Sequence, residues 1–417
     1  MPIQKDKVQT DGVDQQPGRP FNQMIHSGAL ASYRLDMLNR QLIYATENSR
    51  FYSSRMPKQS LPLASLEAFR DLPFTCADDI KHSALDMVCV DAGQVERIVT
   101  INSTGSSDSP KRLFFSEQDL AHTVDFFSVG MRYMCGVGDS VMICMPGRAE
   151  HSIGRLLAKG LGIIGAKANT YGIISNYPAA VAALRHTAPR TIVGIPAQIR
   201  KLALLAPDIR PANVLLSADY VSHVGSATLS RIWGCEVFTH YGLTESAYGC
   251  AVECPAHAGQ HIRHDELYLE IVSPDGTDIL PDGQWGEIVI TTLRREAMPI
   301  IRYRTGDIGR LLHKKCACGS FLPRLDHVRG RISELAHEIN IYALDELLLG
   351  DDRVLDYQAS YADGRLTVGL EAASADAFET CRKLLHEQWP DLQVSLVQAD
   401  NPAVGWTVKR SIARRLC

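Results

Sequence analysis

The feature that most constrains the fold is a regular alternation between Ser140 and Leu216. Short apolar runs, typical of strands, occur at residues 141–145, 166–170, 191–194 and 213–217. Stretches with helical spacing separate them, at residues 153–161, 179–186 and 197–205. Strands separated by helices are joined by crossover connections, so their sheet is parallel. The alternation therefore predicts an α/β fold in which helices cover parallel sheets.

The pattern changes after Gly249. Strand-like runs at residues 266–272, 286–292 and 308–312 are separated by the turn pairs Asp275-Gly276 and Asp282-Gly283. This predicts an antiparallel β subdomain at about residues 250–330. We expect a boundary near residues 330–334 and a small α+β domain over residues 333–417. That domain should contain two strands around residues 363–364, a helix over residues 375–387 and a strand over residues 393–397.

The N-terminal part is expected to be helical. Residues 28–52 and 65–72 have helical spacing, residues 95–101 read as a strand, and residues 116–134 read as a helix that Ser116 caps. At 417 residues the chain is longer than one ordinary domain. We therefore expect one large domain over residues 21–332 in addition to the small one. Residues 1–20 are polar, and we expect a disordered lead-in with no signal peptide.

Composition excludes several classes of partner. A net charge of −4 gives no reason to expect nucleic acid or an anionic membrane as a partner. No run approaches the ~20 apolar residues that cross a bilayer. The 11 cysteines are scattered through apolar segments, as buried free thiols of a reducing compartment are. The cytoplasm is the expected location.

A motif with several chemical groups occupies residues 240–246, after the strand-like run at residues 235–239. His240, Tyr241, Gly242, Thr244 and Glu245 combine aromatic rings, a flexible glycine, a hydroxyl and a carboxylate. A ring can lie against a base, a hydroxyl can contact a phosphate and a carboxylate can bind Mg²⁺. On its own, the motif fits a plain strand followed by a turn as well as it fits a nucleotide site.

A second segment, the polar loop Ser103-Thr104-Gly105-Ser106-Ser107, follows the strand expected at residues 95–101. Such loops point backbone N–H groups and hydroxyls at an anion. A surface linker is the alternative. The loop lacks the two spaced glycines and the lysine of a P-loop.

The order of these motifs identifies a family. The polar loop is followed by Tyr-Gly-x-Thr-Glu at 241–245, by Tyr-Arg-Thr-Gly-Asp at 303–307, by Gly-Arg at 330–331 and by Lys409. From about Phe51 to its C-terminus, the chain resembles the adenylate-forming acyl/aryl-CoA ligase superfamily, and within it the phenylacetate–CoA ligase group. The likeness includes residues 66–75. It implies a mobile C-terminal domain that rotates about a hinge near Ser333 between two half-reactions.

The resemblance implies that ATP activates a carboxylic acid as an acyl-adenylate, which a thiol then attacks. The polar loop would hold the β- and γ-phosphates, and Tyr241 would stack on adenine beside His240 and Gly242. The segment Ser217-Ala218-Asp219 matches the family's Gly-Ala-Glu next to adenine.

The remaining roles follow in the same way. Thr244 would contact the α-phosphate, Glu245 would ligate Mg²⁺ and Asp307 would accept hydrogen bonds from both ribose hydroxyls. Arg331 would add a ribose contact, and Lys409 would bridge the carboxylate and the α-phosphate. The alternatives are a turn aspartate at 307, a surface ion pair at 331, and a basic tail around 409.

The chain departs from the family pattern at three places. Asp108-Ser109-Pro110 stands where the family loop ends in Gly-Lys-Pro, so Lys111 or Arg112 is the candidate for the missing cation. Ser333 stands at the usual hinge aspartate. Residues 335–340 lack the glycine past which the pantetheine arm of coenzyme A runs. Adenylation is therefore better supported than transfer to coenzyme A.

A zinc site is expected in the β subdomain. Cys316 and Cys318 form a Cys-x-Cys pair, which can chelate one ion but needs two more ligands for a tetrahedral site. Cys254 and His261 complete a pattern that resembles the Cys3His zinc site of some members of the phenylacetate–CoA ligase group. The rival ligands are Cys250 and His257, and two buried thiols are the alternative without metal. Such a filled site would be structural.

The sequence therefore predicts an acid–thiol ligase that uses ATP, Mg²⁺ and coenzyme A on an aromatic or heteroaromatic acid. Phe126, Tyr133 and Ala218 are the expected walls of the acid pocket. One alternative loads the acyl group onto a carrier protein or another nucleophile. A second is an inactive nucleotide- or acyl-binding protein. Homodimers are common in the resembled group, and the sequence leaves the oligomeric state open.

Overall fold

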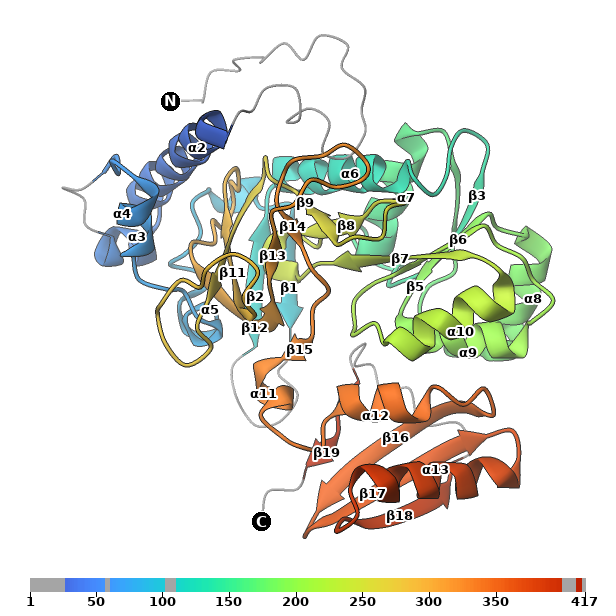
Figure 1. Ribbon diagram of the computed structural model, residues 1–417. Coiled ribbons are helices and arrows are strands. Elements are labelled where there is room, and N and C mark those ends of the chain that lie inside the picture. Colours follow the sequence, from blue (N-terminus) through green and yellow to red (C-terminus); the bar gives the residue numbers. More distant parts are fainter. Residues whose placement is uncertain (1–26, 57–60, 102–109, 400–409, 415–417) are drawn as a thin grey trace.

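The computed structural model describes residues 27–56, 61–101, 110–399 and 410–414 (Figure 1). The expected lead-in at residues 1–20, the polar loop Ser103–Ser107, its neighbours Asp108 and Ser109, and Lys409 lie outside the described residues. Predictions about these segments therefore stay predictions.

The alternating segment forms a parallel sheet, as predicted. Its five strands lie in the order β7-β6-β5-β3-β4 and all neighbours are parallel. The strands are β3 (Ser140–Cys144), β4 (Lys167–Thr170), β5 (Thr191–Gly194), β6 (Asn213–Leu216) and β7 (Glu236–Tyr241). The helices between them are α7 (Ile153–Ile163), α8 (Tyr177–Thr187), α9 (Pro196–Leu205) and α10 (His223–Trp233).

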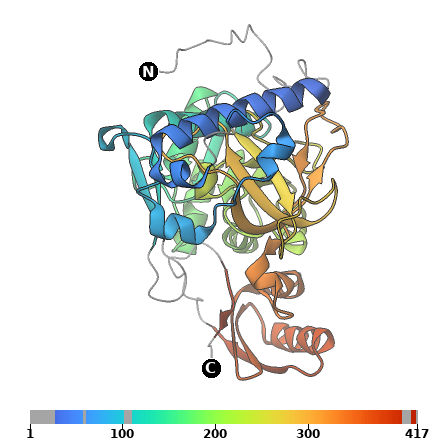
Figure 2. The same cartoon turned by 90° about the vertical axis from the view of Figure 1, so that its left-hand side faces the viewer.

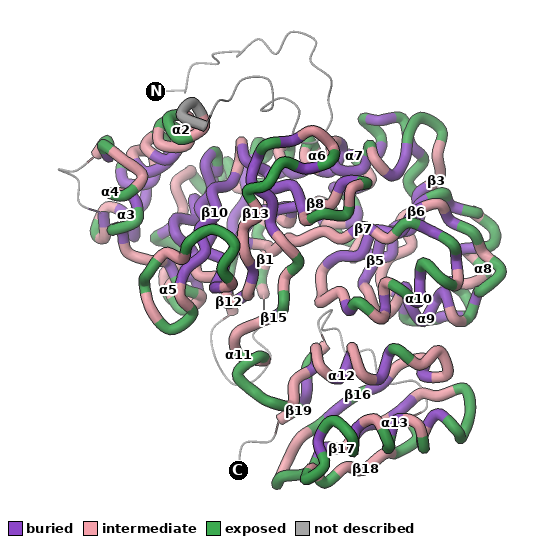
Figure 3. Tube along the Cα trace, in the orientation of Figure 1, coloured by how far each residue is buried: buried purple, intermediate pink, exposed green. Residues whose placement is uncertain are grey.

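Alternate side chains of the strands enter two different cores, because successive residues of a strand point to opposite faces. Ile143 and Leu215 face one core with residues of α7 and of α6 (Glu117–Met131). Met142 and Leu216 face the other core with residues of α8, α9 and α10. The sheet is therefore covered on both sides, which explains the nearly continuous apolar runs of β3, β5 and β6. These three strands are mostly buried, whereas β4 and β7 consist mostly of intermediate and exposed residues (Figure 3).

The predicted antiparallel subdomain is divided between two sheets. Four of its strands extend the parallel sheet beyond β7 to nine strands, in the order β13-β14-β9-β8-β7. They are β8 (Ala251–Glu253), β9 (Gln260–Ile262), β13 (Leu311–Leu312) and β14 (Arg324–Leu325). A separate antiparallel sheet contains β10 (Leu267–Val272), β11 (Gly286–Thr292), β12 (Tyr303–Gly309) and β15 (Gly330–Arg331). The two sheets bring the later motifs next to the end of β7.

The N-terminal helices pack on the outside of this body, where Figure 2 shows α2 running along the surface. They are α2 (Ser27–Asn48), α3 (Arg50–Arg55), α4 (Leu66–Arg70) and α5 (Ala77–Ser83). A short 3-10 turn, η2 (Ala92–Gln94), leads into the antiparallel pair β1 (Arg97–Ile101) and β2 (Lys111–Phe115). Helix α6 begins after Ser116, whose hydroxyl accepts a hydrogen bond from Asp119 N, so Ser116 is the predicted cap.

The C-terminal residues form a small sheet with its own apolar core (Figure 1). The sheet order is β18-β17-β16-β19, from β16 (Val354–Ala362), β17 (Arg365–Ala372), β18 (Gln393–Gln398) and β19 (Ala413–Arg414). Its helices are α12 (Ile341–Leu348) and α13 (Ala375–Gln388), and the short α11 (Ile332–Leu335) leads into it. This unit lies against α9 and α10 of the larger body.

Among the described helices, none combines the length and the apolar character that a bilayer crossing requires.

Candidate active site

The motif after β7 lies at the carboxyl edge of the parallel strands, where open α/β sheets bind ligands. His240 and Tyr241 are the last residues of β7, and the chain then passes Gly242 into the 3-10 turn η3 (Thr244–Ser246). A Cβ at Gly242 would stand 2.0 Å from the carbonyl oxygen of Tyr248. Only glycine therefore fits this turn.

Three residues predicted to hold the nucleoside meet in one group. Tyr241 donates its phenol hydroxyl to Asp307 Oδ2 at 2.9 Å. Arg331 Nε lies 3.3 Å from Asp307 Oδ1, because β12 and β15 pair these two residues directly. Burial, and then the charge of Asp307, raise the pKa of Tyr241 well above its usual value. The phenol therefore keeps its proton and goes on donating.

The carboxylate predicted to bind Mg²⁺ is buried beside a cation. Glu245 Oε1 accepts a hydrogen bond from Tyr303 OH at 2.9 Å and contacts the ammonium of Lys111. Burial by itself would raise the pKa of Glu245, but the charge and hydrogen bond of Lys111 outweigh it and lower the pKa. Glu245 is thus ionised near neutral pH, as a metal ligand must be.

Strand β12 connects these two groups. Tyr303, Thr305 and Asp307 are its buried alternate residues, so they share one face of the strand. Tyr303 contacts Glu245, and Asp307 contacts Tyr241. The two acidic groups therefore lie on the same side of the molecule, around one site.

The segment after β6 borders this site. Ser217 Oγ and His240 Nδ1 are 2.7 Å apart. Ala218 has a positive φ of 74°, and Asp219 Oδ2 accepts a hydrogen bond from the backbone N–H of Arg410 at 2.9 Å. The C-terminal unit is thus attached to the site at the residue that follows Lys409 in the sequence.

An apolar cavity of about 420 Å³, including open solvent at its mouth, adjoins the motif. Helices α6 and α7 and the strands of the central sheet form its walls. The lining residues are Phe126, Phe127, Gly130, Met131, Met145, Ile153, Leu157, Val193, Leu215, Ser217, His240 and Val252. Phe126 was expected here, whereas Tyr133 and Ala218 are not among the lining residues.

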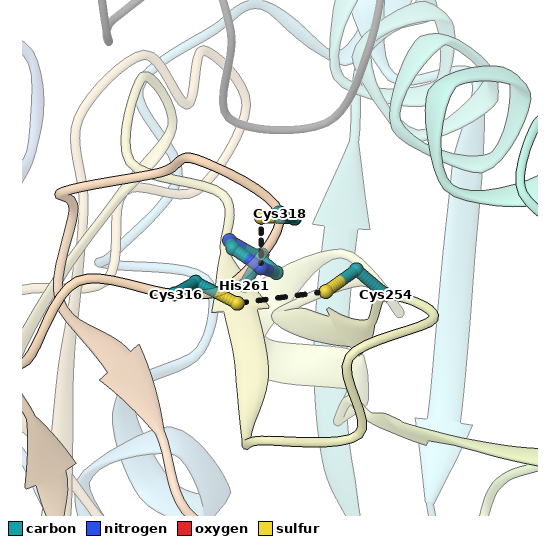
Figure 4. A group of neighbouring side chains, drawn as sticks. All are labelled: Cys254, His261, Cys316 and Cys318. Carbon is teal, nitrogen blue, oxygen red and sulfur yellow. Dashed lines mark hydrogen bonds between the residues drawn. The ribbon is translucent and has the colours of Figure 1, made fainter.

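The four residues of the expected zinc site meet around one point (Figure 4). Their ligand atoms all lie within 4.8 Å of one another. Cys254 and His261 come from the region of β8 and β9, whereas Cys316 and Cys318 come from the loop between β13 and β14. The group therefore joins two hairpin regions of the nine-stranded sheet.

The distances within this group suit zinc. Cys254 Sγ and Cys316 Sγ are 3.7 Å apart, and Cys318 Sγ and His261 Nε2 are 3.5 Å apart. A tetrahedral ion with ordinary Zn–S and Zn–N bonds requires about 3.8 Å between two sulfurs and about 3.6 Å between sulfur and nitrogen. The rival ligands Cys250 and His257 are not part of the group, and His257 instead lies 3.7 Å from Glu253.

Two features of the site were not predicted from the sequence. The sequence predicts the motif at 303–307 but not the contact of Tyr303 with Glu245. The pairing of Ser217 with His240 was also missed, although both residues were placed near adenine. The adjacency of β6 and β7 is the signal that could have found this pair. Thr244 is half-buried beside Glu245.

Proteins of known function are similar to this chain. Four proteins named phenylacetate-coenzyme A ligase are 24% to 28% identical to it. The protein from Thermus thermophilus is 26% identical over 337 residues, which cover 75% of this chain and 73% of the relative. The protein from Escherichia coli K12 is 24% identical over 400 residues, which cover 86% and 85%. No model of a protein family matches the chain.

Solved structures share its fold. A 2-hydroxyisobutyryl-CoA ligase in the postadenylation state, in complex with R3-HIB-AMP, has a TM-score of 0.81 at 18% identity, over 97% of this chain and 93% of that chain. The ligase in the thioesterification state, in complex with 2-HIB-AMP and CoA, has a TM-score of 0.69 at 19% identity, over 95% and 92%. These relatives and the shared fold support the adenylate-forming CoA ligase superfamily for this chain. Within it, its sequence relatives are phenylacetate-coenzyme A ligases.

Proposed function

We propose that this protein activates an aromatic carboxylic acid with ATP and passes the acyl group to coenzyme A. The observation that carries the proposal is the joining of two groups by β12. One contains Tyr241, Asp307 and Arg331, and the other contains Glu245 with Lys111. Together they offer a ring for the base, a carboxylate for the ribose and a second carboxylate for a metal ion.

In the first step, a carboxylate oxygen of the acid attacks the α-phosphorus of ATP. An O–P bond forms, the bond between the α-phosphorus and its bridging oxygen breaks, and pyrophosphate leaves. Asp307 accepts hydrogen bonds from the ribose hydroxyls, Thr244 contacts the α-phosphate, and Lys409 bridges the reacting oxygens. Glu245 would hold Mg²⁺, which neutralises phosphate charge when bound. The protein contributes placement and charge neutralisation.

In the second step, the sulfur of coenzyme A attacks the acyl carbonyl, and AMP leaves with the former acid oxygen. The C-terminal domain, residues 333–417, turns about the hinge near Ser333 between the steps. Free cysteines and ATP use are consistent with a cytoplasmic reaction. A homodimer remains an expectation.

A carrier-protein thiol is the second candidate acceptor. The sequence of residues 335–340, which lacks the glycine beside the pantetheine arm, favours it. The acceptor affects only the second step, so the two candidates share every residue of the adenylation site. Release of AMP that depends on coenzyme A separates them.

We also propose a structural zinc ion held by Cys254, His261, Cys316 and Cys318. The match between their spacing and a tetrahedral ion supports it. Three cysteines and one histidine fill all four positions, so no position remains for a catalytic water. The ion would tie the loop between β13 and β14 to β8 and β9.

Acid-dependent exchange of pyrophosphate into ATP tests the adenylation step. We expect exchange with Mg²⁺ and a suitable aromatic acid. Asp307→Asn should lower kcat/KM for ATP about ten- to hundredfold, because a hydrogen bond to a charged group contributes about 1.5–3 kcal/mol. Asp208→Asn, in an exposed pair with Arg185, is the matched control and should change nothing. No exchange with any acid would support the inactive binding protein instead.

A further inference from the structure

One side chain in the wall of the apolar cavity has an unsatisfied polar atom. His240 Nδ1 is 2.7 Å from Ser217 Oγ. Its other ring nitrogen, Nε2, is buried and has no hydrogen-bond partner within the described ranges. The rings of Phe126 and Phe127 lie 5.9 Å and 6.2 Å from the imidazole. All other lining residues of the cavity are apolar.

A buried polar atom without a partner is rare in folded proteins, because it loses its bonds to water and gains none in return. A water molecule is a poor partner here. An ordered buried water needs two to four polar neighbours, and the cavity wall offers only Ser217 and His240, which already bond each other. Since the described residues offer His240 Nε2 no partner, a bound ligand is the partner that we consider.

The ionisation state of His240 restricts the ligand's chemistry. Burial lowers the pKa of His240 to about 4, so the ring is neutral at pH 7. Because the Ser217 hydroxyl can rotate, the neutral ring presents Nε2 either as a donor or as an acceptor. A hydroxyl group can pair with both forms, since it donates and accepts. A carboxylate would match only one form and would lose its solvation in the apolar cavity.

The lining and the position of the cavity agree with an aromatic ring. Its wall contains Phe126, Phe127 and aliphatic side chains, which suit an apolar ring. The cavity wall includes His240, and the next residue of β7, Tyr241, belongs to the nucleotide group on the opposite face of the strand end. A ring in the cavity would therefore lie beside the adenylation site.

We infer that the acid activated by this protein carries a ring hydroxyl, which hydrogen-bonds to His240 Nε2 and makes His240 a specificity-determining residue. This inference rests on the proposed function, since it assigns the cavity to the acid of that reaction. Ser217 acts on the substrate through His240 and is a positioning residue.

Matched pairs of benzoic and phenylacetic acids that differ only in an ortho, meta or para hydroxyl test this inference. Two readouts apply: kcat/KM for pyrophosphate release, and binding of the acid without ATP by calorimetry. We expect the wild-type protein to prefer one hydroxylated isomer over its parent by about tenfold or more, because the parent leaves Nε2 unpaired. His240→Phe should abolish this ratio, and His240→Gln should restore part of it through its amide. His386→Phe, on the exposed surface of α13, should leave the ratio unchanged.

The outcomes separate this inference from the proposed function. The role of His240 is overturned if pyrophosphate is released without a hydroxyl preference, or if His240→Phe shows the same preference as the wild type. Either result leaves the proposed ligase activity supported. A hydroxyl preference in binding that depends on His240, without any pyrophosphate release, supports the inference for the cavity and contradicts the ligase. No binding and no release overturn both.

Discussion

Lys111 is the counter-ion of Glu245, the carboxylate that would hold Mg²⁺ in the proposed reaction. Its ammonium contacts Glu245 and also lies 5.9 Å from the centre of the Tyr303 ring. The sequence offers Lys111 or Arg112 as the cation that the family loop otherwise supplies. In the structure, the contact with Glu245 favours Lys111 for this role.

Replacing Lys111 should therefore shift the acid limb of activity. In Lys111→Met, the ammonium that lowers the pKa of Glu245 is gone, whereas the burial that raises this pKa remains. The pKa of Glu245 therefore rises, and its protonation begins at a higher pH. We expect the acid limb of Mg²⁺-dependent pyrophosphate exchange, measured from about pH 5 to pH 8, to move to higher pH. Lys159→Met, in an exposed pair with Glu150, is the control. An unmoved limb in Lys111→Met would contradict this role.

His264 should make the fold sensitive to acid. Arg34 donates to its Nδ1 at 3.2 Å, and its Nε2–H donates to Pro323 O at 2.8 Å, so the ring is held neutral. Burial, and then the charge of Arg34, lower its pKa from 6.5 to about 3. Unfolding therefore takes up a proton below pH 6.5. This residue's stabilisation is complete above 6.5 and is lost as the pH falls toward 3.

The variant His264→Gln can keep both hydrogen bonds without titrating. Its free energy of unfolding should depend less on pH between about pH 4 and 6, by a difference approaching about 1.4 kcal/mol per pH unit. Urea titrations of both proteins across this range measure the difference. Parallel pH profiles would show that His264 does not take up the proton.

For single residues, the grouping of several candidate site residues could be predicted because they belong to ordered motifs, and their roles stay predictions. Tyr241, Glu245, Asp307 and Arg331 lie together, as the resemblance implies. The contact between Ser217 and His240 was missed, because it joins the residue after β6 to a residue of β7 and depends on the pairing of the two strands. Long-range side-chain pairs depend on the register of such pairing.

Among the secondary-structure elements, the turn between β7 and η3 depends most on one backbone position. In Gly242→Ala, the new Cβ meets the carbonyl oxygen of Tyr248 and must displace the turn. We expect pyrophosphate exchange to fall by at least about tenfold while the fold persists, because a small displacement of site residues has large effects on rate. Circular dichroism checks the fold.

Gly162→Ala is the matched control. A Cβ there meets nothing within 4 Å, and the position is exposed in α7. Alanine should keep activity and stabilise the helix by about 0.5–1 kcal/mol. Equal losses of activity in the two variants would contradict the role assigned to the turn.

The zinc proposal concerns two hairpin regions. Elemental analysis should give about one zinc per chain, as one four-ligand site requires. Cys316→Ser with Cys318→Ser should lose the metal and lower the melting temperature, because the loop between β13 and β14 is then free of β9. Cys144 and Cys235 are buried thiols outside the group, so the double variant Cys144→Ser with Cys235→Ser should keep its zinc. Retention of zinc by the first double variant would contradict the ligand assignment.

Elements with a regular apolar pattern were predicted well, and short or polar ones were not. Strand β5 has the predicted bounds, Thr191–Gly194. Strand β12 begins at Tyr303, earlier than the predicted residue 308, because its polar alternate residues resemble a turn. The three-residue strands β8 and β9 carry too few residues for a period, so their addition to the parallel sheet could not be read from the sequence.

Across the whole molecule, polar contacts hold the C-terminal unit against the larger body. Glu346 of α12 accepts hydrogen bonds from Tyr220 OH and from the backbone N–H groups of His223 and Val224, at the start of α10. Lys201 of α9 pairs with Glu371 of β17 at 2.5 Å. These contacts, with Asp219 and Arg410, stabilise the observed arrangement of the two units.

If the C-terminal domain turns between half-reactions, these contacts must break in the second step. Glu346→Ala should therefore lower pyrophosphate exchange more than it lowers thioester formation from a supplied acyl-adenylate. Glu379→Ala, in an exposed pair with Arg382, is the control. Equal effects on the two half-reactions would contradict a role for this arrangement in adenylation.

A crystal structure of the protein soaked with ATP, Mg²⁺ and a hydroxylated aromatic acid tests the central claim most directly. We predict one adenylate whose base lies on Tyr241, whose ribose hydroxyls bond Asp307 and whose aromatic ring fills the cavity at His240. A nucleotide bound away from Tyr241 and Asp307 would contradict the account.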